Sequence, residues 1–169
     1  MKIVDYDPTQ GMAFQGDVAI VPIPAGITIA TNDEIRPVAG RLIIQEGEAS
    51  GHHHAIALPR ARNFRDDRRT LGDPGVMTKS PRLGRSLGGA KPAAAEPTAR
   101  LYQDQQAVTR LQAHGVITRA DLAIGCLVVE RGPVVVSHEE HDGLRLPIGR
   151  YYVGRQVESA GADERKVVD

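Results

Sequence analysis

The sequence predicts a mainly β protein, a small barrel or sandwich with one helix and a long arm rich in Gly, Pro and Arg. Short runs of Val and Ile recur between turn-forming residues, which is typical of β-strands. Glycine (18) and proline (11) are both above average usage, which favours strands and turns over a helix bundle. A chain of 169 residues is long enough to bury a core as one domain, or as one domain with a large excursion.

The first part of the β core is expected over residues 1–58, after an irregular lead-in at 1–12. A short apolar run predicts a strand at 17–23, and the prolines at its end favour an edge position. A second short strand is expected at 26–30. Residues 41–45 predict a clear strand, 46–51 a turn, and 52–58 the return strand.

Residues 59–97 are expected to form an extended basic arm, because ten of these 39 residues are Gly or Pro and no hydrophobic period persists. Between residues 60 and 91 there are nine Lys/Arg against three Asp, so the rest of the neutral chain carries the opposite excess. A basic arm beside an acidic body predicts contact with a partner, although a solvated loop is the plainer alternative. The expected partner-contact residues are Arg60, Arg62, Arg65, Arg68, Arg69, Arg82 and Arg85.

Residues 98–125 are expected to be the helical part of this insertion. Thr98 can cap a helix that ends at His114 before Gly115, and a short helical turn is expected at 118–123. The β core resumes over 126–158, with strands expected at 126–130, 134–137, 144–147 and 150–157. Residues 159–169 read as a loose polar tail.

The single cysteine, Cys126, excludes an intrachain disulfide framework and is best read as a buried thiol. The first ten residues lack the apolar segment of a signal peptide, and no run approaches the ~18 apolar residues of a membrane span. These features predict a soluble protein of a reducing compartment, with no membrane contact.

Five of the six histidines lie in two clusters, one at 52–54 and one at 138–141. Alternation along a strand places His52 and His54 on one side, and His138 and His141 could face the same way on a tight turn. Neutral imidazole binds divalent metals, so these four histidines could hold a metal, with zinc the first expectation. Glu139 or Glu140 could then be a ligand, a second-shell acceptor or a general base. The alternative is a polar surface without metal.

Two groups of proteins are similar to parts of this sequence. The Gly51-His-His-His turn with a later histidine resembles the metal edge of cupin-type β-barrels, although Ala55–Leu58 stand where cupins place a glutamate. The segments Gln15-Gly-Asp-Val, Gly51-His-His-His, His138-Glu-Glu-His and Leu146-Pro-Ile-Gly-Arg-Tyr-Tyr-Val resemble small β-domain proteins of unassigned function from bacterial and phage genomes. This second resemblance covers residues 15–58 and 126–158. It implies a compact β-domain with the two clusters close together, and no known activity.

Three functions compete at this point. The first expectation is a non-enzymatic structural or binding module of a larger assembly, such as a phage capsid decoration (cement) protein. Its partners would be copies of itself, a trimer being one such arrangement, and a capsid shell. Its location would be the virion if phage-encoded and otherwise the cytoplasm. The second is a cupin-like metalloenzyme that uses His52, His54, His138 and His141. The third is nucleic-acid binding through the arm, ranked last because the arm lacks interleaved aromatic residues.

Overall fold

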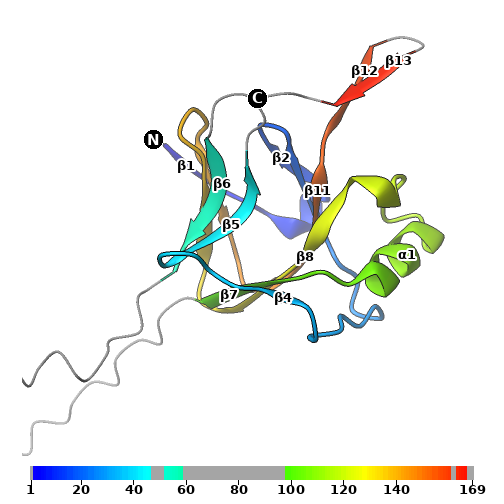
Figure 1. Cartoon of the computed structure of the whole chain (residues 1–169), viewed down its shortest axis with the longest axis horizontal. Helices are drawn as coiled ribbons and strands as arrows, with labels where there is room; N and C mark the ends of the chain where they lie inside the picture. Colours follow the sequence, from blue (N-terminus) through cyan, green and yellow to red (C-terminus); the bar gives the residue numbers. More distant parts are fainter. Residues whose placement is uncertain (1, 47–51, 59–97, 161–162, 167–169) are drawn as a thin grey trace, which may run out of the picture. The chain divides into compact units, whose positions relative to one another are not determined.

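The computed structural model describes residues 2–46, 52–58, 98–160 and 163–166, with side chains described up to residue 156. Residues 1–59 and 95–169 make up one compact unit. Its described part is mainly β, with two large sheets, a separate two-stranded sheet and one α-helix (Figure 1). The predicted fold class is therefore confirmed at the level of a mainly β protein with one helix. No closed barrel forms within the described ranges.

The first large sheet has five strands in the order β1-β10-β9-β6-β5. Their bounds are Ile3–Asp5 (β1), Gly143–Leu146 (β10), Val134–Ser137 (β9), His53–Ala57 (β6) and Arg41–Glu46 (β5). All neighbours are antiparallel except β1, which runs parallel to β10. The strands predicted at 41–45, 52–58, 134–137 and 144–147 are present within one or two residues.

The second large sheet has six strands in the order β2-β3-β11-β8-β7-β4, all paired antiparallel. Their bounds are Ala13–Gln15 (β2), Val18–Pro22 (β3), Gly149–Arg155 (β11), Ala123–Arg131 (β8), Thr98–Tyr102 (β7) and Glu34–Ile35 (β4). The strands predicted at 17–23 and 126–130 are found as β3 and β8. The predicted short strand at 26–30 is wrong, because the chain there forms a turn and irregular backbone instead.

Alternation along the strands of the second sheet separates two apolar clusters. Val18, Ile20, Leu127 and Val153 point into a core that they share with strands of the first sheet. The intervening residues, Val21, Cys126 and Tyr152 among them, face the other way and pack against the helix. The same sheet is therefore buried on both faces, which explains why its strands are almost continuously apolar.

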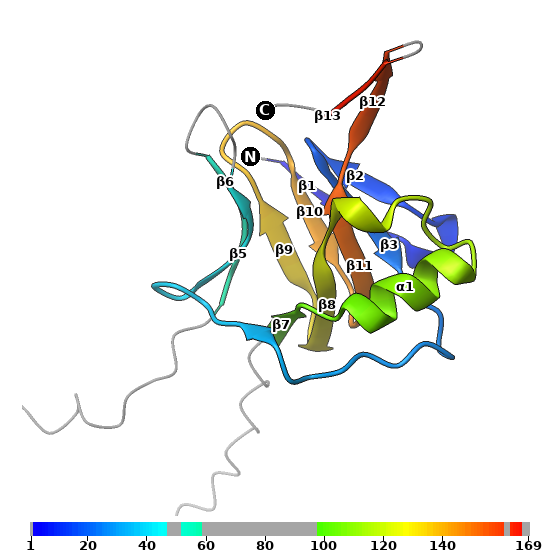
Figure 2. The same ribbon diagram turned by 45° about the vertical axis from the view of Figure 1, so that its right-hand side comes forward.

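The helix α1 spans Gln105–Ala113 and covers the outer face of the second sheet with Ala107, Val108 and Leu111 (Figures 1 and 2). The predicted start at Thr98 is wrong, because residues 98–102 are strand β7. Asp104 is the N-cap, and its carboxylate accepts a hydrogen bond from the Ala107 backbone N–H at 3.0 Å. Gly115 follows the helix with a φ of 69°, as expected for a residue that ends a helix. The predicted turn at 118–123 is a 3-10 helix at Ala120–Leu122.

Two terminal segments are more ordered than the sequence indicated. The expected irregular lead-in contains β1 and a 3-10 helix at Pro8–Gln10, capped by Asp7. The expected loose tail contains the hairpin of β12 (Val157–Ala160) and β13 (Asp163–Lys166). In both cases the segment is ordered by backbone hydrogen bonds between paired strands. The side-chain pattern of the sequence does not indicate this pairing. Within the described ranges no helix is long and apolar enough to cross a membrane.

Candidate metal centre

The two histidine clusters lie at neighbouring positions of the first sheet. Strand β6 pairs with β9, with Ala55 opposite Ser137, so the residues before Ala55 lie beside those that follow β9. The rings of His54 and His138 are stacked with centroids 4.3 Å apart, and His141 stacks on His138 at 4.7 Å. His52 meets His138 edge to face at 5.7 Å. Whether these histidines meet could not be told from sequence, and the fold brings all four together.

The buried ring of His54 contacts Gln15 on β2 and Asp17 in the turn between β2 and β3. The ring is 1% exposed, and its Nε2 lies 2.8 Å from Oδ1 of Asp17. Its Nδ1 lies 3.4 Å from Oε1 of Gln15, whose amide nitrogen donates to the carbonyls of Val136 and Asp142. Those two hydrogen bonds identify the donating nitrogen of the Gln15 amide, so the atom that faces His54 is the amide oxygen. Both ring nitrogens of His54 therefore face acceptor oxygens, one from Gln15 and one from Asp17.

Asp17 in turn is shared between two partners from the first sheet. Its Oδ2 accepts a hydrogen bond from the side-chain amide of Gln45 on β5, while its Oδ1 faces His54 on β6. Asp17, Gln45 and Gln15 are all buried. A carboxylate is costly to bury unless it is paired. The contact with His54 and the hydrogen bond from the Gln45 amide offset the cost of burying Asp17.

The residues best placed to hold a metal are His52, His138 and Glu139. One ligand atom from each lies within 4.8 Å of those of the other two. Glu139 is fixed from behind, because its Oε2 accepts a hydrogen bond from the His53 backbone N–H at 3.0 Å. Its Oε1 lies 3.9 Å from the Arg41 guanidinium. Two imidazoles and one carboxylate are a common donor set for zinc and for non-haem iron.

The electrostatics around Glu139 keep its carboxylate ionised. The backbone hydrogen bond from His53 is the main cause that lowers the pKa of Glu139. Burial opposes it, and the Glu139 backbone, His138 and His52 add smaller lowering effects, so the pKa remains below its ordinary value. An ionised oxygen is the form that binds a cation. Glu140 is placed differently, since its Oε1 lies 3.5 Å from Nδ1 of His52.

The proton on His138 decides which of its nitrogens could bind a metal. Its Nδ1 accepts a hydrogen bond from the Glu140 backbone N–H at 3.2 Å. In the neutral ring the proton is then on Nε2. A metal would have to replace the Glu140 N–H at Nδ1, or bind Nε2 after the proton has moved. Metal binding at this site would therefore be coupled to a change in the 138–140 turn.

The structure brings the four predicted histidines and both predicted glutamates close together. Among the described residues, His52, His138 and Glu139 form the group that could hold a metal, and Glu140 lies beside His52. The predicted arm contacts, from Arg60 to Arg85, lie outside the described residues. Sequence reasoning missed Asp17, Gln15 and Gln45.

Comparison with known proteins leaves the function open. A family model, described as a domain of unknown function (DUF8820), matches residues 14–81. The match includes Asp17, Gln45 and the first histidine cluster but ends well before His138. It agrees with the expected likeness to a family of unassigned function. No curated protein and no solved structure matches the chain.

Proposed function

We propose that this protein is a non-enzymatic, metal-binding structural module of a larger assembly. The observation that carries the proposal is the approach of His52, His138 and Glu139 within 4.8 Å of one another. These residues come from the start of β6 and from the β9–β10 turn, so a metal would tie two segments that are 86 residues apart. Zinc is the expected ion, because it takes imidazole and carboxylate ligands and has no redox role.

A metal at this position would stabilise the fold and would not need a substrate pocket. The cavities lined by Asp33, by Ile35, by Met12 and by Val4 include neither His52, His138 nor Glu139 among their walls. His54 would support the site without binding the ion, because its nitrogens face Asp17 and Gln15. The two large sheets, which share one core, would form a sandwich.

The assembly we propose consists of copies of this chain, a trimer being one arrangement, seated on a shell such as a phage capsid. The protein would then be a decoration protein of the virion. Support comes from the edge strands β1 and β2, where Ile3, Val4 and Phe14 are between 41% and 50% exposed. Exposed apolar side chains on sheet edges are suited to association. The uneven charge of the sequence would add electrostatic complementarity.

The test is the metal content of tag-free protein by mass spectrometry, together with its mass in solution by light scattering. We expect about one zinc per chain, lost in His138→Ala and in Glu139→Ala. His114→Ala is the matched control, because His114 caps α1 away from the site. An apo protein with unchanged mass and melting temperature would remove the metal from the proposal, and a monomer at all concentrations would remove the assembly.

The second candidate function is a cupin-like metalloenzyme. The donor set of two histidines and one carboxylate favours it, because three protein ligands leave coordination positions open for water or substrate. Glu140 beside His52 would be the candidate base. Cobalt-substituted protein distinguishes the two functions: an azide-dependent change in its visible spectrum indicates an open position, whereas an unchanged spectrum supports a closed structural site.

A further inference from the structure

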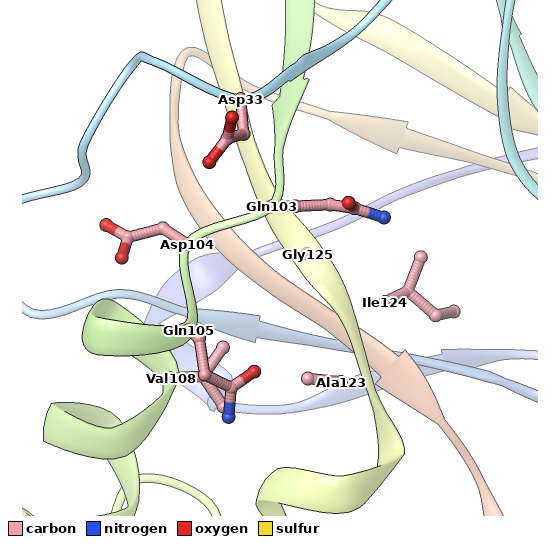
Figure 3. A pocket seen from close by; sticks show the side chains of 8 residues that line it. All are labelled: Asp33, Gln103, Asp104, Gln105, Val108, Ala123, Ile124 and Gly125. Atoms are coloured by element: carbon pink, nitrogen blue, oxygen red, sulfur yellow. The ribbon is translucent and has the colours of Figure 1, made fainter.

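Most of the exposed apolar side chains gather at the edge formed by β1 and β2. Among the described residues six large apolar side chains are exposed, and four of them lie on β1 or beside and within β2: Ile3, Val4, Met12 and Phe14. Val4 and Phe14 line the same cavity of about 280 Å³. The cavity shown in Figure 3, beside β8, includes no residue of either strand. A contiguous exposed apolar surface of this kind indicates a binding surface.

Strand β2 is the first strand of the second sheet, so it has a neighbour on one side only. The direction of its backbone groups follows from the strands beside it. Ile23, directly after β3, donates its backbone N–H to β11. Backbone groups of successive residues in a strand point to opposite sides, so Ile20 faces β2, and its partner Ala13 faces β3. The next residue, Phe14, therefore points its N–H and C=O away from the sheet.

Met12 and Phe14 present their side chains on the same face of this edge. Side chains alternate along a strand, and Ala13 packs against the core between the two large sheets, so its neighbours point to the outer face. Met12 and Ala19 line one cavity there, and Ala19 is opposite Phe14. Met12 is 54% exposed and Phe14 50%. The edge of β2 thus combines outward backbone groups with two half-exposed apolar side chains.

The sequence around β2 favours a second copy of this chain as the partner. Residues 8–16 contain no charged residue, although edge strands usually carry charges that prevent pairing. In a two-fold contact each residue near the axis lies close to its own copy, so a charge there would repel itself. The segment is also self-complementary. When Ala13 is opposite Ala13 of the second copy, Met12 of each copy is opposite Phe14 of the other, and the small Ala13 side chains stand at the axis.

We propose that two copies of this chain associate through β2, which pairs antiparallel with β2 of the second copy about a two-fold axis at Ala13. Met12 and Phe14 exchange backbone hydrogen bonds with the residues opposite them, so the six-stranded sheet continues into the second copy. The thioether of each Met12 packs on the Phe14 ring of the other copy. The inference rests on the association of copies in the proposed function, gives that association a two-fold dimer as its unit, and is independent of the metal.

Sedimentation of the full-length, tag-free protein over a dilution series measures the association. We expect a monomer–dimer equilibrium whose dissociation constant rises at least tenfold in Phe14→Asp. Val38→Asp is the matched control, because Val38 is 62% exposed and lies just before β5, at the opposite edge of the first sheet. Its dissociation constant should stay within twofold of that of the unaltered protein. Melting temperatures show whether both variants are folded.

A cysteine at the axis tests the register without placing a charge at the edge. In a non-hydrogen-bonded antiparallel pair the two Cα atoms are about 4.5 Å apart, which a disulfide can span. Ala13→Cys should therefore form a covalent dimer when the protein is oxidised with diamide. Val38→Cys is the control and should remain monomeric on a non-reducing gel. The native Cys126 has no exposed surface and does not compete.

Three results would overturn the inference. A monomer at every concentration removes it together with the proposed assembly. An oligomer whose mass is unaffected by Phe14→Asp removes the inference alone, because the copies would then meet through another surface and the assembly would stand. Equal cross-linking of Ala13→Cys and Val38→Cys would show that β2 does not pair with itself in this register.

Discussion

At the scale of single residues, Cys126 lies in β8 with no exposed surface. Burial, with a smaller contribution from the charge of Asp104, raises the pKa of its thiol to about 11. Because the thiolate is the reactive form, we expect a thiol reagent at pH 8 to label native protein far more slowly than protein in urea. Absorbance of a released chromophore measures both rates. Fast labelling of the native protein would show that this face of β8 opens to solvent.

The same pKa predicts a loss of stability in alkali. Below pH 9 the thiol is protonated in both the folded and the unfolded chain. Between the ordinary pKa of 9 and about 11 the unfolded chain releases its proton first, so the free energy of unfolding decreases as pH rises. Burial raises the pKa of Tyr151 and Tyr152 to about 12, which extends the loss to higher pH. Urea titrations should show a shallower decline over pH 9–11 for Cys126→Ala.

The candidate site could be found in part from sequence, because histidine and glutamate are metal ligands and stand next to one another in the chain. His52, His138 and Glu139 were identified in this way. Asp17 was not, because nothing around it indicates a role until β3 brings it beside β5 and β6. Its function depends on contacts across two sheets, and one sequence contains no direct record of such contacts.

At the scale of elements, Asp104 determines where α1 begins. Its carboxylate accepts hydrogen bonds from the backbone N–H groups of Ala107 and Ala30, at 3.0 and 2.7 Å. Replacing an N-cap aspartate by alanine typically costs ~0.5–2 kcal/mol, and the Ala30 contact places Asp104→Ala at the upper end. Asp104→Asn should recover most of the loss. Equilibrium unfolding in urea measures both variants, and an unaffected alanine variant would contradict this role.

The pH dependence of this cap follows from its pKa. Burial acts to raise the pKa of Asp104, but the backbone hydrogen bonds from Ala30, Ala107 and Gln106 together lower it below the ordinary value. The contribution to stability is therefore present above the ordinary aspartate range and is lost as pH falls through the lower, folded-state value. The destabilisation by Asp104→Ala should shrink in acid.

Gly125 gives a test of the close contact between β7 and β8. A Cβ added there would lie 2.7 Å from the Tyr102 carbonyl oxygen and 3.1 Å from a Leu101 methyl group. Since backbone must move to admit it, we expect Gly125→Ala to cost ~1–3 kcal/mol, as overpacking does. Gly26→Ala is the control, because its Cβ would meet nothing within 4 Å. Equal melting temperatures for the two variants would contradict the close contact.

The elements themselves were predictable wherever a local pattern was enough. Strands β3, β5, β6, β8 and β9 were found because apolar runs are bounded by turn residues. The helix was placed too early because Leu101 falls on the same helical face as Val108 and Leu111. Pairing of β7 with both β8 and β4 overrides that periodicity, and Asp104 then starts the helix. Strand β1 escaped prediction because its partner is far away in the chain.

At the scale of the whole molecule, the contacts of Asp17 link the two sheets through a buried polar network. Removing one partner of a buried hydrogen-bonded contact leaves the other polar group unsatisfied, which costs ~1–3 kcal/mol. We expect Asp17→Leu to fall in this range by urea unfolding and Asp17→Asn to cost less. The control is Asp5→Ala, which breaks an exposed pair with Arg145 that should contribute only ~0–1 kcal/mol. Similar losses for Asp17→Leu and Asp5→Ala would show that the network does not join the sheets.

The parallel pairing of β1 with β10 sets an order of events during folding. Ile3 needs Gly143 as its neighbour, so β1 is synthesised long before the edge that accepts it exists. Joining such distant segments carries a large loop-closure cost until the β9–β10 hairpin is in place. The strand should therefore be the last to dock and the first to detach. In hydrogen exchange, its amides should exchange well before those of β3 and β11, although all belong to one compact unit.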